Sequence, residues 1–404
     1  MTICYIYQDQ FPWDIRVEKF VETFNMAGLM THIVSRNRKG LAVQEEFLEN
    51  VKIHRLTKGF GRISRSFANF PAFFSPIWLR EIFRVAKVFE ARVIMVRDLP
   101  LSPSAIFIGK ILKIPVVIDM AENYPAMLDD AFKYRAKKFR DYLIRNPNFL
   151  GSMEKWVVRN VDGIIVVSEE SENRILKLFR GGKRPPIWIV GNTPRLRQED
   201  HSSQHPLIEN IRKREGLHLL YVGGMETSRG LDIVIKALSY LLSQNFPLHF
   251  IVVGEGESRN KLAGQLKTLG LEKNVMLTGY IEQKYISSII RSCDICIIPH
   301  YVSEHTDTTI PNKIFDYMAQ GKPVLATHAR TLRNIVVGTR CGYIYKDSDS
   351  QALAKCILAL SDAEKRKELG ENGRSAVLTR FNWDVDKKNL LSAVDYFLNS
   401  SKTT

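Results

Sequence analysis

The sequence predicts an α/β protein made of two doubly wound domains, and three observations lead to this prediction. The chain has 404 residues, whereas a single core usually serves ~100–200 residues. Short β-branched apolar runs alternate with helical patterns along most of the sequence, which is typical of α/β domains. Glycine, proline and polar residues gather near 180–215, as they do in a connection between domains.

The expected strands are continuous apolar runs, which indicate strands buried on both faces of a parallel sheet. In the first half they cover 2–7, 93–97, 115–119 and 163–168. In the second half they cover 218–224, 249–254, 275–279, 294–299 and 323–327. The stretch from about 383 has the pattern of a terminal amphipathic helix.

These elements define the expected boundaries. We place an N-terminal domain over 1–185, a second domain over 186–382, and a C-terminal helix over 383–404 that can cross back to the first domain. Both domains are expected to face a central cleft, because ligands of open α/β sheets bind at the carboxyl ends of the strands.

Composition restricts the classes of partner. The formal net charge of +15, with 45% hydrophobic and 25% charged residues, describes a globular protein that favours an anionic partner: a nucleotide, a phospholipid surface or nucleic acid. The sequence shows no signal peptide and no stretch that would span a bilayer, so a cytoplasmic location is expected. Five scattered cysteines predict no disulfide framework, and the histidines show no metal-like pairing.

The stretch PNKIFDYMAQGKPV at 311–324 predicts a short helix with Pro311 as its first residue, ended by Gly321. Backbone N–H groups at its start can face a phosphate, aided by the helix dipole and by Lys313. Asp316, one turn along, can accept hydrogen bonds from ribose hydroxyls. The alternative is a surface ion pair between Lys313 and Asp316 on a helix whose apolar side chains face the core.

Two further segments repeat a plan of strand, glycine turn and helix. They are YVGGMETSRGLDIVIKAL at 221–238, with Arg229 beside the turn, and VVGEGESRNKL at 252–262. Glycine turns at strand ends permit a close approach of the backbone to a phosphate, although each alone is a weak signal. Three such segments in order favour a nucleotide site.

Most of 215–350 resembles the nucleotide-binding domain of GT-B glycosyltransferases of the family 4 type, which implies two Rossmann-like domains. Two positions depart from the family pattern: Gly224 stands where the family has its first arginine, and Thr308 where it has its first acid. The PNK form resembles a subgroup that acts on bacterial cell-surface polysaccharides. The resemblance places the nucleotide-sugar site at Gly223, Gly224, Arg229, Gly254, Gly256, Tyr280, Ile281, Thr308, Thr309, Ile310, Pro311, Asn312, Lys313 and Asp316.

In the first half, the loop and helix at 11–37 resemble the acceptor side of the same family. Asp14 and Arg16 are candidate acceptor residues there, with helix capping as the alternative for this polar pair. After the strand 115–119, Glu122 is the candidate catalytic carboxylate that positions or deprotonates the acceptor hydroxyl, and Asn123 is its acceptor-side neighbour. The alternative for Glu122 is a surface acid.

Residues 58–84 interleave Arg62, Arg65, Arg80 and Arg84 with Phe67, Phe70, Phe73, Phe74 and Trp78. This composition suits an anionic membrane interface, and 133–145 adds positive charge. The alternative is a helix whose aromatic face lies in the core.

The family resemblance implies a retaining, metal-independent sugar transfer that requires no cofactor. The donor is a nucleotide diphosphate sugar, with UDP preferred over GDP, and the acceptor is a lipid-linked oligosaccharide or other glycan for lipopolysaccharide or capsule, built at a membrane's inner face. Arg229 and Lys313 are the candidate catalytic cations. The alternatives are a nucleotide-sugar 2-epimerase and a basic nucleic-acid-binding protein; no nucleic-acid partner is expected, because no RNA-binding or zinc-finger motif is present.

Overall fold

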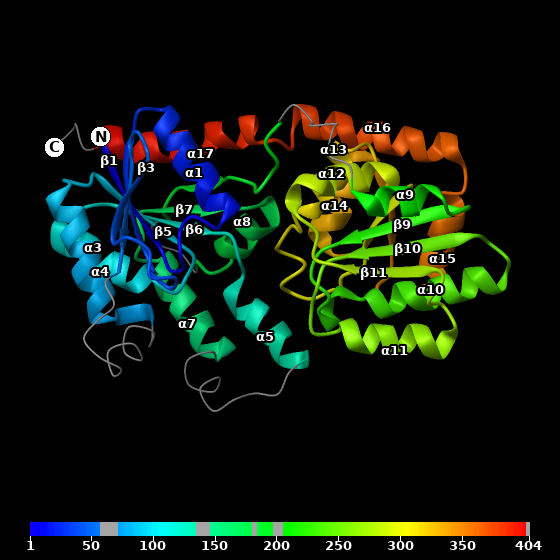
Figure 1. Ribbon diagram of the computed structural model, residues 1–404. Coiled ribbons are helices and arrows are strands. Elements are labelled where there is room, and N and C mark those ends of the chain that lie inside the picture. The colour runs from blue at the N-terminus through cyan, green and yellow to red at the C-terminus, as the bar shows by residue number, and fades with distance from the viewer. Residues whose placement is uncertain (57–71, 135–145, 180–183, 197–204, 401–404) are drawn as a thin grey trace. The chain divides into compact units, whose positions relative to one another are not determined.

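The computed structural model describes residues 1–56, 72–134, 146–179, 184–196 and 205–400. Two compact units divide the chain (Figure 1). Unit 1 comprises Met1–Asn192 together with Asp384–Thr404, and unit 2 comprises Thr193–Trp383. Each unit is built on its own sheet.

In the described part of unit 1, eight strands form one sheet in the order β3-β4-β2-β1-β5-β6-β7-β8. Their bounds are Thr2–Tyr7 (β1), Met30–Ser35 (β2), Gln44–Leu48 (β3), Val51–Arg55 (β4), Val93–Arg97 (β5), Val116–Met120 (β6), Gly163–Val166 (β7) and Ile187–Ile189 (β8). Strand β3 is antiparallel to β4, and the other pairs are parallel. The helices are Ile15–Met26 (α1), Ala72–Phe74 (η1), Pro76–Val88 (α3), Ser102–Leu112 (α4), Tyr124–Tyr134 (α5), Pro147–Val158 (α7), Glu169–Leu176 (α8) and Trp383–Ser400 (α17).

Helices cover both faces of this sheet. On one face, α3 buries Trp78 and Ile82 against Cys4 and Ile6 of β1. On the other, Phe20 of α1 meets Tyr5 of β1 edge to face, with ring centroids 6.4 Å apart. Because successive strand residues point to opposite faces, a strand covered on both sides must be apolar throughout, which explains the continuous runs.

In the part of unit 2 that the structure describes, six parallel strands form one sheet in the order β11-β10-β9-β12-β13-β14. They are Leu217–Val222 (β9), Leu248–Val253 (β10), Val275–Gly279 (β11), Ile295–Ile298 (β12), Val324–Thr327 (β13) and Gly342–Tyr345 (β14). The helices are Pro206–Arg212 (α9), Thr227–Arg229 (η2), Leu231–Ser243 (α10), Arg259–Leu269 (α11), Gln283–Ser292 (α12), Lys313–Ala319 (α13), Arg330–Thr339 (α14), Ser350–Ala359 (α15) and Ala363–Thr379 (α16). One core includes α9, α12, α13 and α14, and the other includes α10, α11 and α15.

The predicted fold class is confirmed. Each of the nine predicted apolar runs overlaps one strand, and the ends of run and strand differ by at most two residues. Five described strands were not among the predicted runs: β2, β3, β4, β8 and β14. Strand β3 has the plainest reason, because its sequence QEEFL lies at the sheet edge with its first three residues exposed. An edge strand that faces solvent needs no apolar run, and charged residues there discourage pairing with other chains.

The C-terminal helix α17 packs on unit 1 (Figure 1). Asn389 donates a hydrogen bond of 2.9 Å to the carbonyl of Ile189. The ring of Phe397 lies 5.8 Å from that of Trp188 between centroids, and Leu390 and Val394 are fully buried. The last described helix therefore completes the core of the unit that begins the chain.

A buried histidine pair, His32 and His54, lies beside this sheet in unit 1. Nδ1 of His32 is 2.9 Å from Nε2 of His54, and the ring of Phe89 stacks on His32 at 3.8 Å between centroids. Nδ1 of His54 lies 3.3 Å from a guanidinium nitrogen of Arg84. Since arginine only donates, His54 accepts at Nδ1 and donates from Nε2 to His32. Burial lowers the pKa of each histidine to about 4.

Candidate functional site

Two glycine turns meet at the carboxyl ends of β9 and β10 in unit 2. Gly223 follows β9 with φ of 144°, and Gly254 follows β10 with φ of 139°. The N–H of Gly223 donates to the carbonyl of Val253 at 2.9 Å. A Cβ on Gly254 would overlap the carbonyl oxygen of Gly223, and one on Gly256 would lie 2.5 Å from the backbone nitrogen of Met225. Only glycine fits these positions, which leaves a half-buried rim of bare backbone.

Lys313 of α13 reaches this rim. Its ammonium lies 4.1 Å from the ring centroid of Tyr221 in β9, and a Cβ on Gly223 would overlap its Nζ. The hydroxyl of Tyr221 in turn donates to the carbonyl of Gly224 at 2.8 Å. The aromatic face holds the cation by its quadrupole, so Lys313 is positioned against the turn.

Within the described residues, Lys313 forms no ion pair with a carboxylate. The surface pair with Asp316, the alternative left open by the sequence, is therefore not made. Desolvation lowers the pKa of Lys313 well below its ordinary value, and the charge of Arg229 lowers it further, against the opposite influence of Glu226 and Asp316. An anion bound beside Lys313 would therefore stabilise its charged form.

Arg229 ends η2, between β9 and α10. Its Nε donates to Glu226 at 2.9 Å, and its Nη1 lies 3.5 Å from Nδ1 of His300. His300 is buried after β12, and burial together with the charges of Lys313 and Arg229 lowers its pKa well below its ordinary value. Neutral His300 can therefore accept from Arg229 without adding positive charge.

The residues before α13 differ from expectation. The helix begins at Lys313 with Asn312 as its cap, so the prediction of Pro311 as first residue was two residues early. The N–H groups of Thr308 and Thr309 both donate to the carbonyl of His305. Because they are already used, these two groups do not face a ligand as expected from the sequence.

The other predicted donor residues lie around the same edge of the unit 2 sheet. Tyr280 follows β11 and is 78% exposed, whereas its neighbour Ile281 is buried in the core. Asp316 is half-buried, one turn into α13, and Ile310 is half-buried before it. The structure therefore gathers the glycine turns, Arg229, Lys313 and α13 at the carboxyl ends of β9, β10 and β12.

Three residues of this site were not predicted. The ring of Tyr221 contacts the ammonium of Lys313, and the carboxylate of Glu226 accepts a hydrogen bond from Arg229. His300 is buried close enough to both cations for their charges to lower its pKa. Tyr221 stands two residues before Gly223 and Glu226 three residues after it. Their proximity to the glycine turn could therefore have been predicted from the sequence. For His300, only its place directly after the predicted strand 294–299 was a signal.

In unit 1 the predicted acceptor residues have structural contacts. Asp14 caps α1 by accepting from the N–H of Arg16 at 2.9 Å and of Val17 at 3.1 Å, which is the alternative considered for it. Asn123 accepts from the N–H of Ala126 at 3.4 Å before α5. Glu122 is half-buried in the loop after β6.

Arg16 belongs to a buried charge network. Its guanidinium lies 2.6 Å from Oδ1 of Asp119, and both side chains are almost fully buried. Arg97 lies 3.5 Å from Asp119 and 3.2 Å from Asp98. Burial raises the pKa of Asp98 to about 6, although Arg97 opposes this. The network ties β5 and β6 to α1.

The predicted membrane segment is only partly described. Arg62, Arg65, Phe67 and Phe70, and residues 135–145, lie outside the described residues. In the described part, Phe73 and Trp78 are buried in the core of unit 1 and Phe74 is exposed. None of the helices that the structure describes is both long and apolar enough to cross a bilayer.

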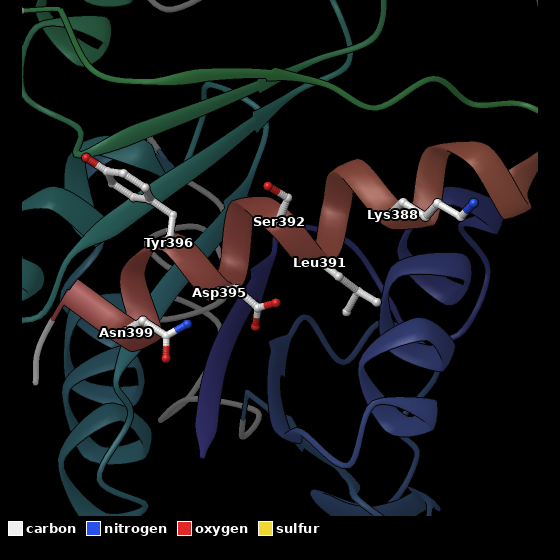
Figure 2. Close-up of a pocket in the computed structure, with 6 residues that line it drawn as sticks. All are labelled: Lys388, Leu391, Ser392, Asp395, Tyr396 and Asn399. Carbon is white, nitrogen blue, oxygen red and sulfur yellow. The ribbon is translucent and has the colours of Figure 1, made fainter.

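One groove lies away from these residues, along α17. Lys388, Leu391, Ser392, Asp395, Tyr396 and Asn399 line it (Figure 2). Its volume is about 770 Å³, and none of the predicted site residues borders it. Among the described residues, no cluster of three or more histidine, cysteine or acidic side chains could hold a metal ion.

Comparison with known proteins supports the family resemblance. Residues 207–376 match the family model of group 1 glycosyl transferases. The amylovoran biosynthesis glycosyltransferase AmsK of Erwinia amylovora is 26% identical over 192 residues, which cover 46% of this chain and 47% of AmsK. The matched region thus spans about half the length of that curated relative.

Solved structures agree over nearly the whole chain. Sucrose-phosphate synthase from Thermosynechococcus elongatus aligns with a TM-score of 0.76 at 17% identity, covering 99% of this chain and 100% of that one. HepE of Anabaena in complex with UDP aligns with a TM-score of 0.70 at 15% identity, covering 98% and 100%. The chain has the GT-B fold, and its predicted resemblance to GT-B glycosyltransferases is confirmed.

Proposed function

We propose that this GT-B protein is a retaining glycosyltransferase that moves a sugar from a nucleotide diphosphate sugar to a hydroxyl of a cell-surface glycan. The observation that carries the proposal is Lys313, an ammonium held without an ion pair among the described residues against the glycine turn at Gly223. A cation next to bare backbone at the carboxyl ends of parallel strands suits a diphosphate.

The donor site would use two cationic side chains, a lysine and an arginine. Lys313 and Arg229 would contact the diphosphate, and Glu226 would keep Arg229 in place through their 2.9 Å hydrogen bond. Asp316 would accept from the ribose hydroxyls one turn along α13. UDP is the proposed nucleotide, because HepE, which shares the fold, was solved with UDP.

The chemical step needs negative charge to develop on the leaving diphosphate. Lys313 and Arg229 stabilise that charge as the bond to the anomeric carbon breaks. Their electrostatic stabilisation is stronger in a site that excludes water. A leaving phosphate oxygen can take the proton of the acceptor hydroxyl on the same face of the sugar, which would retain the anomeric configuration without a metal ion. Glu122 is proposed to position the acceptor hydroxyl.

The acceptor is proposed to be a growing polysaccharide, bound at the inner face of a membrane in the cytoplasm. AmsK, the relative named above, is an amylovoran biosynthesis glycosyltransferase. The net charge of +15 would favour peripheral contact with anionic lipids. Binding to anionic vesicles, compared with neutral ones, tests this part separately.

Calorimetric titration with UDP and then GDP, in EDTA, tests the donor site. We expect micromolar binding of UDP that is lost in Lys313→Ala and Asp316→Ala and kept in Lys236→Ala, whose lysine is exposed on α10. Failure of both nucleotides to bind would refute the proposal. Incubation with UDP-sugar alone separates transfer from epimerisation, since only an epimerase forms a new nucleotide sugar without an acceptor.

A further inference from the structure

Two loops of unit 1 are joined at the carboxyl ends of neighbouring strands. Strands β1 and β2 pair in parallel up to Tyr7 and Ser35. Beyond them, Oε1 of Gln10 accepts from the N–H of Arg38 at 3.0 Å and of Lys39 at 2.9 Å. Arg38 also pairs with Asp9 at 3.1 Å. The loops therefore form one surface, at the edge where open α/β sheets bind ligands.

Trp13 lies on this surface in an unfavourable backbone conformation. Its φ is 153° and its side chain is 66% exposed. The residues around it are fixed: Phe11 is fully buried and Asp14 caps α1. A non-glycine residue at such φ persists only where its surroundings impose it, and such strain gathers at ligand-binding sites. Here it holds a large indole out toward solvent.

Positively charged side chains lie in the same two loops as the indole. The ammonium of Lys39 lies 3.9 Å from the ring centroid of Trp13. Neither Lys39 nor the half-buried Arg36 forms an ion pair among the described residues, and Asp9 is already engaged by Arg38. Nε2 of the buried Gln10 also has no hydrogen-bond partner there. The surface thus offers an exposed aromatic ring, covered on one face by Lys39, and two cations without carboxylate partners in the described part of the chain, while the amide of Gln10 lies buried beneath it.

We propose that Trp13, Lys39 and Arg36 bind a sugar residue that carries a carboxylate or a phosphate. The face of an aromatic ring is negative and attracts the C–H hydrogens of a sugar's apolar face. The two cations would bind the acid group through charge-assisted hydrogen bonds. The inference deepens the proposed function, on which it rests, because it makes an acidic glycan the acceptor.

Titration of the full chain with trigalacturonate, neutral galactotriose and glucose 1-phosphate tests this site, by calorimetry and by tryptophan fluorescence. We expect an acidic ligand to bind about tenfold tighter than the neutral one. Binding by trigalacturonate alone would identify the carboxylate as the source of the charge, and binding by glucose 1-phosphate alone would identify the phosphate.

Variants separate stacking from charge. Trp13→Ala should weaken all binding by about tenfold or more and Trp13→Phe should recover most of it. Lys39→Gln and Arg36→Gln should remove the preference for acid while leaving the neutral ligand unchanged. Met26→Ala, an exposed apolar residue of α1, and Lys155→Gln, an exposed lysine of α7, are the matched controls.

The inference is overturned if the acidic ligands bind no tighter than galactotriose, or if folded Trp13→Ala and Trp13→Phe both bind as the original protein does. UDP titration of Trp13→Ala keeps the two proposals apart. Unchanged UDP binding with lost sugar binding supports the new site. If the original protein does not bind UDP, the donor site is refuted instead. The sugar titrations would still test the site at Trp13.

Discussion

Binding of UDP should carry a proton into the protein, and Lys313 is the group that takes it. In the free protein desolvation and Arg229 lower the pKa of Lys313 well below its ordinary value, with Glu226 and Asp316 acting the other way. A diphosphate beside the ammonium favours the charged form and raises that pKa. Between the free and bound pKa values, the complex therefore holds more protons than the free protein.

The magnitude follows from linkage. Uptake is at most one proton, and in that window UDP affinity falls by up to tenfold for each unit of rising pH, which is about 1.4 kcal/mol. Loss of the charge-assisted contact in Lys313→Met costs about 1.5–3 kcal/mol, or about 10- to 150-fold in Kd. His300 stays neutral in this window because its pKa is also lowered.

Calorimetry in two buffers with different ionisation enthalpies measures the proton directly. The titrations belong above pH 8, because a terminal phosphate itself titrates near pH ~6. The apparent binding enthalpy should depend on the buffer in the original protein and not in Lys313→Arg, whose side chain stays charged. Equal enthalpies in both buffers, or the same dependence in Lys313→Arg, would refute the reasoning.

Three further outcomes are expected. Arg16→Met should lower the free energy of unfolding by about 3–5 kcal/mol, because it leaves Asp119 buried without its main partner; a loss under about 1 kcal/mol in urea unfolding would contradict the buried-pair account. Gly254→Ala should destabilise unit 2 and weaken UDP binding, since its Cβ overlaps backbone at positive φ, whereas Gly264→Ala in open space on α11 should gain about 0.5–1 kcal/mol in the same measurements. The free energy of unfolding should fall as pH drops from 6.5 to about 4, the window set by the lowered pKa values of the histidine pair, because protonation favours the unfolded chain; His54→Gln should flatten this slope, and an unchanged slope would exclude the pair as its cause.

Much of the fold could be predicted because burial on both faces of a strand leaves a direct record in composition. The runs at 2–7 and 275–279 coincide with β1 and β11 residue for residue. Strand β3 left no such record, since its position is set by pairing with β4 at a solvent-facing edge. Local sequence predicts well which residues are buried, but it predicts poorly which distant segments pair with each other.

The site was predictable to a smaller degree for the same reason. The glycine turns and Lys313 stand in recognisable local patterns, and the structure brings them together. The contact of Lys313 with Tyr221 joins residues 92 positions apart, so no local pattern contains it. Arg16 shows the converse: its place shortly after the first strand suggested an acceptor contact, whereas its guanidinium pairs with Asp119, 103 positions away.

The packing of α17 on unit 1 also constrains the order in which the protein can form. Unit 1 needs Phe397 and Leu390 in its core, yet the ribosome makes them only after all of unit 2. Residues 193–383 can therefore finish folding while unit 1 waits with an incomplete core and an exposed Trp188. During synthesis, the half of the protein that is made first is the half that matures last.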